Sequence, residues 1–260
     1  VDLFERQATN ADVEKIAGSD VVLVAAGRVR RPGEDRSDLY KDNAATVRAI
    51  CADIKRLAPR AVVVNVVEPI DSLTLLIHEE LGGDRRRVLG VGGLLSSTRI
   101  RYLVSSALGV SPREVTALIV GPHRQSMVVL QDSIRVSGIP AAQLLGEERL
   151  AAIVEEARGA GDAILQMAQH STAYYAPSAA VCALVEAVVR DTHAILPVSV
   201  RLEGEYGVAG LCVGVPAQIG TAGAERILEV RMRDGEARAF RAAVDEFKAV
   251  LAQKTGRRFA

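Results

Sequence analysis

The stretch Val21-Val22-Leu23-Val24-Ala25-Ala26 ends at Gly27 and has a later counterpart in Ala61-Val62-Val63-Val64-Asn65-Val66-Val67. Both runs are short, apolar and rich in β-branched residues, without the polar alternation of a half-exposed strand. This pattern is typical of strands that are buried on both faces of a parallel sheet. Arg87-Val88-Leu89-Gly90-Val91 is a weaker third run. We therefore predict three parallel strands in the first half of the chain.

Helical periodicity fills the gaps between these strands. Residues 39–57 carry apolar side chains at helical spacing, and Pro59 marks the end of that helix. Residues 71–81 form a second apolar helix, which Asp71 or Ser72 can cap. Strands alternating with helices imply right-handed crossovers. The fold class is therefore α/β, with a Rossmann-type doubly wound parallel sheet.

The second half of the chain has a different pattern. We place a domain boundary near Gly92-Gly93, so that residues 1–93 form a dinucleotide-binding domain and residues 94–260 an α+β substrate domain. Strands are expected over residues 115–120, 198–202 and 208–215, the last two antiparallel. Helices are expected over residues 96–108, 147–169, 176–191 and 236–253.

Composition excludes some classes of protein. The 260 residues include 32 Lys+Arg and 32 Asp+Glu, so the net charge is zero, which argues against a nucleic-acid or membrane-surface binder. The chain opens on a charged stretch rather than a leader, and no apolar run is long enough to span a bilayer. Three scattered cysteines are expected to be reduced core thiols in a cytoplasmic protein, and no metal site is expected.

Candidate site residues follow the strand ends. Ligands bind at the carboxyl ends of parallel strands, where Gly27, Glu68 and Gly92-Gly93 lie. Residues 28–36 include four arginines and the turn Pro32-Gly33. This loop is either an ordinary solvated loop or a lid that closes on an anionic substrate.

Two further features suit binding of a carboxylic acid and proton transfer to or from it. Arg99 and Arg101 lie two residues apart on a predicted helix, so only one of them can point into a cleft, where its guanidinium could grip a carboxylate. His123 follows a buried strand on a short turn, which suits an acid/base group near neutral pH. A surface arginine is the simpler interpretation of either guanidinium taken alone.

Together these features resemble the malate/lactate dehydrogenase family, from about Asp20 to the C-terminus. The matching motifs are Ser19-Asp20-Val21-Val22, Ala26-Gly27, Arg30-Arg31-Pro32-Gly33, Arg36-Ser37-Asp38-Leu39, Asn43, Pro69-Ile70-Asp71, Gly92-Gly93, Leu95, Ser97-Thr98-Arg99-Ile100-Arg101, Gly121, His123, Ser126-Met127, Tyr174-Tyr175-Ala176-Pro177-Ser178-Ala179-Ala180, Leu196-Pro197, Glu203-Gly204-Glu205-Tyr206-Gly207 and Gly214-Val215-Pro216.

The resemblance implies hydride transfer between a nicotinamide cofactor and a 2-hydroxy or 2-oxo acid. His123 corresponds to the acid/base, Arg99 to the arginine that grips the carboxylate, and Arg36 to the arginine that polarises the carbonyl. Arg30 stands at the substrate-selecting position, where arginine goes with a second carboxylate, as in malate. Ala173 stands at the other specificity position and is small, again as in malate enzymes. By the same resemblance, the remaining expected contacts are Asn43 with substrate and cofactor, and Gly27, Val67 and Glu68 with the cofactor.

Two departures from the family pattern concern the histidine. Ser96 stands where the family has the aspartate that orients and charges the histidine, and a serine cannot stabilise an imidazolium by charge. Glu68 replaces an asparagine that would bond the substrate. This carboxylate either repels an acid substrate or lies close enough to His123 to replace the lost aspartate.

Two further departures concern the surroundings of the site. The glycine and aspartate that follow the histidine in the family are Arg124 and Gln125 here, which crowds the turn or adds a cation to the pocket. No Gly-x-Gly-x-x-Gly motif occurs in the chain, and the first 18 residues cannot contain the family's opening strand, turn and helix, of which Asp2 is at most a remnant. Without that strand, residues 21–26 are expected to form an unpaired edge.

The leading hypothesis is a malate-dehydrogenase-type oxidoreductase that uses NAD, with NADP not excluded, and that forms a homodimer or homotetramer. A second hypothesis is a catalytically impaired or silent relative that binds an anionic 2-oxo acid or a partner protein. A third is a redirected enzyme in which Arg124 binds an additional anionic group of an unusual 2-oxo acid.

Overall fold

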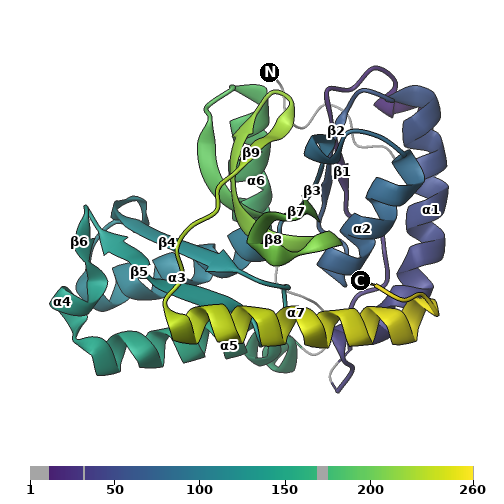
Figure 1. Ribbon diagram of the computed structural model, residues 1–260. Helices are drawn as coiled ribbons and strands as arrows, with labels where there is room; N and C mark the ends of the chain where they lie inside the picture. The colour runs from purple at the N-terminus through teal and green to yellow at the C-terminus, as the bar shows by residue number, and fades with distance from the viewer. Residues whose placement is uncertain (1–11, 32, 169–174, 260) are drawn as a thin grey trace.

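The computed structural model describes residues 12–31, 33–168 and 175–259 (Figure 1). Asp2, Ala173 and Tyr174, which the sequence comparison singled out, lie outside these ranges, as does Pro32. The largest sheet has six strands in the order β1-β2-β3-β7-β8-β9. Its first three strands are parallel: β1 (Val21–Val24), β2 (Val62–Asn65) and β3 (Val88–Gly90).

Helices cover both faces of the parallel strands. α1 (Tyr40–Leu57) and α2 (Ile70–Leu81) pack on one face, and α6 (Tyr175–Val189) lies against β1 and β2 on the other. Consecutive side chains point to opposite faces of each strand, and those of β2 and β3 are buried on both faces. In β1, Val22 and Val24 are buried but Leu23 is 44% exposed, so the prediction of burial on both faces was wrong for this edge strand. The predicted α/β fold is confirmed.

The second half of the chain extends this same sheet. β7 (Ala194–Glu203), β8 (Ala209–Gly220) and β9 (Gly223–Ile227) are antiparallel neighbours, as predicted for the first two. β7 joins β3 in antiparallel fashion with Gly90 opposite Ser199. The sequence analysis predicted neither β9 nor this junction, because pairing between distant strands leaves no local signal.

A second, three-stranded sheet carries the loop of His123. It consists of β4 (Val115–Val120), β5 (Val128–Val136) and β6 (Ile139–Pro140). Three helices pack beside it around a core that includes Ile100, Ile119 and Ile134. They are α3 (Gly92–Leu108), α4 (Ala141–Leu145) and α5 (Glu147–Ala168).

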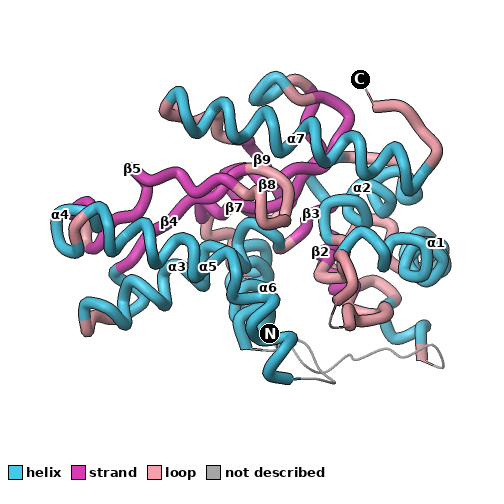
Figure 2. Tube along the Cα trace, turned by 90° about the horizontal axis from the view of Figure 1, so that it is seen from below, coloured by secondary structure: helices cyan, strands magenta, loops and turns pink. Residues whose placement is uncertain are grey.

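The last helix, α7 (Asp234–Thr255), lies across both sheets (Figures 1 and 2). Near its start, Arg233 pairs with Asp132 of β5. Near its end, Lys254 Nζ lies 2.8 Å from a carboxylate oxygen of Asp38. The helix therefore bridges the two halves of the molecule and holds the loop that precedes α1 close to the second sheet.

Three sequence predictions have structural outcomes outside the site. β1 is the outermost strand of its sheet among the described residues, as expected of an unpaired edge. Cys51 and Cys212 are buried free thiols, but Cys182 is exposed on α6, so the prediction of three core thiols was wrong for that residue. In the described part of the chain, no helix is both long and apolar enough to cross a membrane.

Candidate active site

The candidate active site lies where four segments converge. The loops after β1 and β2 contribute Arg36 and Glu68, the first turns of α3 contribute Ser96 and Arg99, and the loop after β4 contributes His123. Parallel strands end at one edge of a sheet, so residues far apart in sequence meet there. The structure thus brings together the catalytic residues that the sequence predicted.

The His123 ring lies between a hydroxyl and a carboxylate. Its Nδ1 is 3.5 Å from Oγ of Ser96, and its Nε2 is 3.5 Å from Oε1 of Glu68. The ring is buried, yet Nε2 has no hydrogen bond of normal geometry among the described residues. Gly92 makes this packing possible, since a Cβ there would lie 2.6 Å from Cβ of His123. A buried, unbonded Nε2 is a natural contact point for a substrate hydroxyl.

Asp71 fixes the backbone of the histidine. Its carboxylate accepts a hydrogen bond of 2.5 Å from the backbone N–H of His123. The sequence analysis interpreted Asp71 or Ser72 as a helix cap, which is wrong: α2 begins after Pro69 and has no side-chain cap. Burial raises the pKa of Asp71. This positioning role was missed because nothing near Asp71 in sequence points to a partner 52 residues away.

Glu68 is held in its ionised form. Burial raises its pKa, but the charge of Arg36 and the contact with His123 outweigh this and lower the pKa to about 2. Nε of Arg36 lies 3.5 Å from Oε1 of Glu68, and Nη1 of Arg36 donates to the backbone oxygen of His123 at 3.3 Å. The carboxylate is therefore charged and touches both the acid/base group and the arginine expected at the substrate carbonyl.

Arg99 is the guanidinium that points into the site. A Cβ on Gly161 of α5 would lie 3.0 Å from Nη2 of Arg36 and 3.4 Å from Nη1 of Arg99. The guanidinium groups of these two arginines therefore both lie against α5 at Gly161. No carboxylate is within ion-pair distance of Arg99 in the described residues, and its buried Nε has no partner. Burial and the charge of Arg36 lower its pKa. Arg101 instead donates to the backbone oxygens of Pro112 and Val115, as expected if only one of the two arginines faces the cleft.

Arg30 already has a carboxylate partner in this chain. Its Nη2 donates to Oδ1 of Asp162 on α5, and Oδ2 of Asp162 accepts a 2.9 Å bond from Nε2 of Gln125. Sequence reasoning missed Asp162, because an acidic residue on an amphipathic helix resembles any solvated position.

Arg124 is also engaged with acidic side chains. Its guanidinium lies 3.6 Å from a carboxylate oxygen of Asp35 and 3.6 Å from one of Glu246 on α7. Asp35 caps the short 3-10 helix Arg36–Leu39 by accepting from the backbone N–H of Ser37. The positive charge that the sequence analysis expected in the pocket is therefore balanced by two carboxylates. Through them, Arg124 connects the loop after β4, which carries His123, to the segment of residues 28–36 and to α7.

The remaining predicted contacts lie at the carboxyl ends of β1 and β2. Asn43 is buried, accepts from the backbone N–H of Arg28 and donates to the backbone oxygens of Arg28 and Glu68. Both of its amide hydrogens are thus used within the chain, and in this structure it braces the loop. Gly27 packs against Val67, where a Cβ would come within 2.6 Å of Cγ1.

A nicotinamide cofactor fits the edge beside β1. Ala25, Ala26 and Gly27 follow β1, are small and are exposed, which leaves room for a flat ligand outside the carboxyl ends of the strands. These small, exposed residues would accommodate the nicotinamide end of the cofactor. The described residues contain no Gly-x-Gly-x-x-Gly turn that could hold the pyrophosphate. The glycines between β3 and α3 do not offer one, because Gly92 packs against His123 and Gly93 against Pro197.

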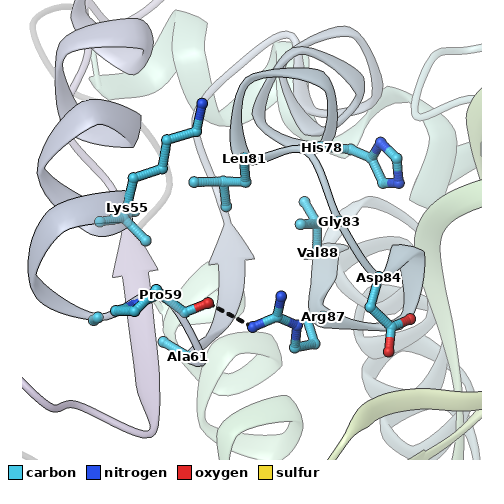
Figure 3. Close-up of a pocket in the computed structure, with 11 residues that line it drawn as sticks. Lys55, Pro59, Ala61, His78, Leu81, Gly83, Asp84, Arg87 and Val88 are labelled. Carbon is cyan, nitrogen blue, oxygen red and sulfur yellow. Dashed lines mark hydrogen bonds between the residues drawn. The ribbon is translucent and has the colours of Figure 1, made fainter.

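Two cavities in the described residues lie away from this site. One of about 60 Å³ lies between α1, α2 and the segment before β3, and is lined by Lys55, His78 and Arg87 among others (Figure 3). An open hollow of about 530 Å³ lies beside it, lined by Arg85 and Glu203 among others. The first is too small for a substrate and a cofactor. In the second, Arg85 pairs with Glu203 and Glu205, and Arg86 with Asp84.

Fold and site together define a dehydrogenase with an arginine-lined site for a carboxylic acid. The family model for the lactate/malate dehydrogenase NAD binding domain matches residues 2–90, and that for the lactate/malate dehydrogenase alpha/beta C-terminal domain matches residues 94–257. The chain belongs to the lactate/malate dehydrogenase family.

Individual relatives agree with this assignment. The chain is 38% identical to a malate dehydrogenase of Rhodopirellula baltica over 94% of its own length and 78% of the relative's. The crystal structure of Cryptosporidium parvum malate dehydrogenase has a TM-score of 0.90 at 31% identity, covering 94% of this chain and 80% of that one. Lactate dehydrogenase of the same organism, solved with lactic acid and nicotinamide adenine dinucleotide, has a TM-score of 0.89 at 31% identity, covering 95% and 79%. The prediction of a nicotinamide-dependent dehydrogenase of this family is confirmed, and the silent relative is not favoured.

Proposed function

We propose that this chain transfers a hydride between NAD and a 2-hydroxy dicarboxylate, interconverting malate and oxaloacetate. The observation that carries the proposal is the pair of unsatisfied buried groups, Arg99 Nε and His123 Nε2, in one site. Buried polar atoms without partners are rare in native proteins, and a bound carboxylate and hydroxyl would satisfy these two.

The residues take complementary roles. Arg99 grips the carboxylate next to the reacting carbon in a two-pronged bond. Arg36 donates to the substrate oxygen, and Nε2 of His123 takes the hydroxyl proton during oxidation and returns it during reduction. Gly27 and Val67, at the neighbouring edge, would hold NAD, which would supply the hydride acceptor.

Ser96 and Glu68 divide the support of the histidine. Ser96 faces Nδ1 and orients the ring through a weak contact. The charged carboxylate of Glu68 lies next to Nε2 and stabilises the imidazolium that forms when the substrate proton arrives. In this proposal Glu68 replaces the charge that a carboxylate in place of Ser96 would supply.

The test is an absorbance assay at 340 nm with oxaloacetate and NADH, run in parallel with calorimetry. Loss of absorbance that requires both reagents, and that His123→Asn abolishes, supports the proposal. Binding of oxaloacetate without turnover would instead support a silent acid-binding protein. Replacing NADH by NADPH measures the choice of cofactor in the same assay.

Three coarser features complete the proposal. We propose a division into a cofactor-binding part that ends at Gly93 and a substrate-binding part that begins at Leu94. The two family models, which end and begin near this point, support the division. We further propose a homodimer or homotetramer in the cytoplasm, to be tested by sedimentation equilibrium and by cell fractionation.

A further inference from the structure

The Asp162 carboxylate is wedged between two segments of the active site. Arg30 Nη2 donates to one oxygen and Gln125 Nε2 to the other, at 2.9 Å for the latter. The Arg30 side chain is only 16% exposed and that of Asp162 37%. This is a half-buried pair, which is stronger than a freely solvated one because water screens it less.

Asp162 also lies close to the arginines that face the substrate. The residue before it, Gly161, packs against the guanidinium groups of Arg36 and Arg99. Burial raises the pKa of Asp162, but the hydrogen bond and charge of Arg30 outweigh this and lower it. The carboxylate is therefore ionised at neutral pH and lies in the same cluster as the anion-binding groups.

Two of the three arginines in this cluster already pair with a carboxylate, which weakens binding of a dicarboxylate relative to a monocarboxylate. Arg30 is paired with Asp162, and Arg36 with Glu68. Arg99 remains as the cation without a carboxylate among the described residues of the cluster. An acid with one carboxylate satisfies Arg99 and leaves the other pairs intact. A second carboxylate must displace Asp162 from Arg30, and two carboxylates at one guanidinium repel each other.

We propose that Asp162 is a specificity-determining residue that competes with the distal carboxylate of the substrate for Arg30. Its effect is to weaken binding of dicarboxylic 2-hydroxy acids relative to monocarboxylic ones. The proposal rests on the proposed function in one respect: Arg30 must be the group that receives the second carboxylate.

L-Malate and L-lactate differ in the distal carboxylate, which lactate lacks. Comparing them therefore separates competition for Arg30 from an effect of Asp162 on the binding of any acid. Asp162→Asn keeps the shape of the side chain and its acceptor for Gln125 but removes the charge. It should tighten malate binding about fivefold, as expected for release of a half-buried ion pair, and leave lactate binding unchanged. Calorimetry measures both acids without requiring turnover. In the absorbance assay the change should fall on KM for malate rather than on kcat.

Two control variants complete the experiment. Glu246→Gln removes a carboxylate that pairs with Arg124 instead of Arg30, so it should leave the malate-to-lactate ratio unchanged. Asp162→Asn in an Arg30→Ala background should have no effect on that ratio. If Asp162→Asn folds poorly, as judged by thermal melting, Asp162→Ala makes the same test with a better helix former.

Equally tighter binding of malate and lactate would overturn the proposal, because it would show only a general change in the electrostatic potential of the site. No change for either acid would overturn it as well. Failure of the proposed function has a different signature, namely no turnover of oxaloacetate by the unaltered protein, and it leaves the calorimetric comparison readable.

Discussion

Arginines gather in two regions of the molecule, and their partners differ. In the short helix Arg85–Arg87, Arg85 pairs with Glu205, Arg86 pairs with Asp84, and Arg87 Nη1 donates to the backbone oxygen of Pro59 at 2.6 Å (Figure 3). In the active site, by contrast, Arg99 is largely enclosed and lacks both a carboxylate and a partner for Nε among the described residues. A run of arginines in the sequence therefore does not mark a site. A buried guanidinium that the chain leaves unsatisfied does, because burial without a partner is costly unless a ligand supplies one.

The largest expected effect is that of Arg99→Ala. Removing one partner of a desolvated charge pair costs about 3 kcal/mol, or roughly a hundredfold in affinity, so malate binding should fall by about that factor. Calorimetry measures the change. The thermal stability of the ligand-free protein should not fall, because the unpaired cation contributes no ion pair to it.

Arg101→Ala is the matched control for that prediction. It is the same substitution on the same helix, but the arginine bonds the backbone oxygens of Pro112 and Val115. It should lower the melting temperature slightly and leave malate affinity intact. A fall in malate affinity as large as that of Arg99→Ala would contradict the assignment of Arg99 to the substrate and of Arg101 to the backbone.

The next effect concerns the acid sensitivity of the site. The pKa of Glu68 is lowered to about 2. The ionised carboxylate therefore stabilises the folded protein at any pH above the ordinary pKa of a glutamate, and this contribution is lost as the pH falls from about 5 to about 2. Glu68→Gln should lower the free energy of unfolding by about 2 kcal/mol at pH 7, a value reduced from the full shift because the side chain is 27% exposed. Urea unfolding of both proteins measures this, and the difference should shrink towards pH 2. A difference that is constant with pH would contradict an ionic origin.

The support of His123 gives the third prediction. If Glu68 replaces the charge missing at Ser96, Glu68→Asn should lower kcat about tenfold. This is less than the roughly 10²-fold or more that a positioned acid or base contributes itself, because Glu68 acts through His123. Ser96→Asp in that background should restore kcat, since a carboxylate would again face the ring, this time at Nδ1. Steady-state kinetics with oxaloacetate measure all three proteins. Equal kcat values in the three would show that neither side chain supplies charge to the histidine.

The sequence was sufficient for most of the fold and for part of the site. Apolar runs rich in β-branched residues predicted β1 and β2, and a weaker run predicted β3, because buried strands leave a local signal in the sequence. β5, β6 and β9 were missed, because their composition is mixed and their pairing depends on distant partners. Motif matches singled out His123, Arg99 and Arg36, which lie in one cluster in the structure.

What the sequence could not supply were contacts across the chain. Asp71 bonds the backbone of His123, and Asp162 bonds Arg30, over separations of 52 and 132 residues. Asp71 stands in the motif Pro69-Ile70-Asp71, but the motif does not name its partner, and Asp162 stands in no motif. In the sequence, Asp71 resembles a helix cap and Asp162 a solvated helix position. Asn43 shows the converse: a residue predicted to bind ligands has both amide hydrogens committed to the backbone of its own chain.

The smallest expected effect returns to the other arginine region. Arg87→Ala removes the bond to the Pro59 oxygen at an exposed position beside the small cavity in Figure 3. Because the Pro59 oxygen can turn to water, the free energy of unfolding should fall by only about 0.5 to 1 kcal/mol. Urea unfolding measures this loss, and kcat and KM for oxaloacetate should stay as they are. A clear change in KM for oxaloacetate would contradict this prediction, because it would mean that this region affects substrate binding. An arginine whose hydrogen bonds are made within the chain would then not be evidence of a purely structural role.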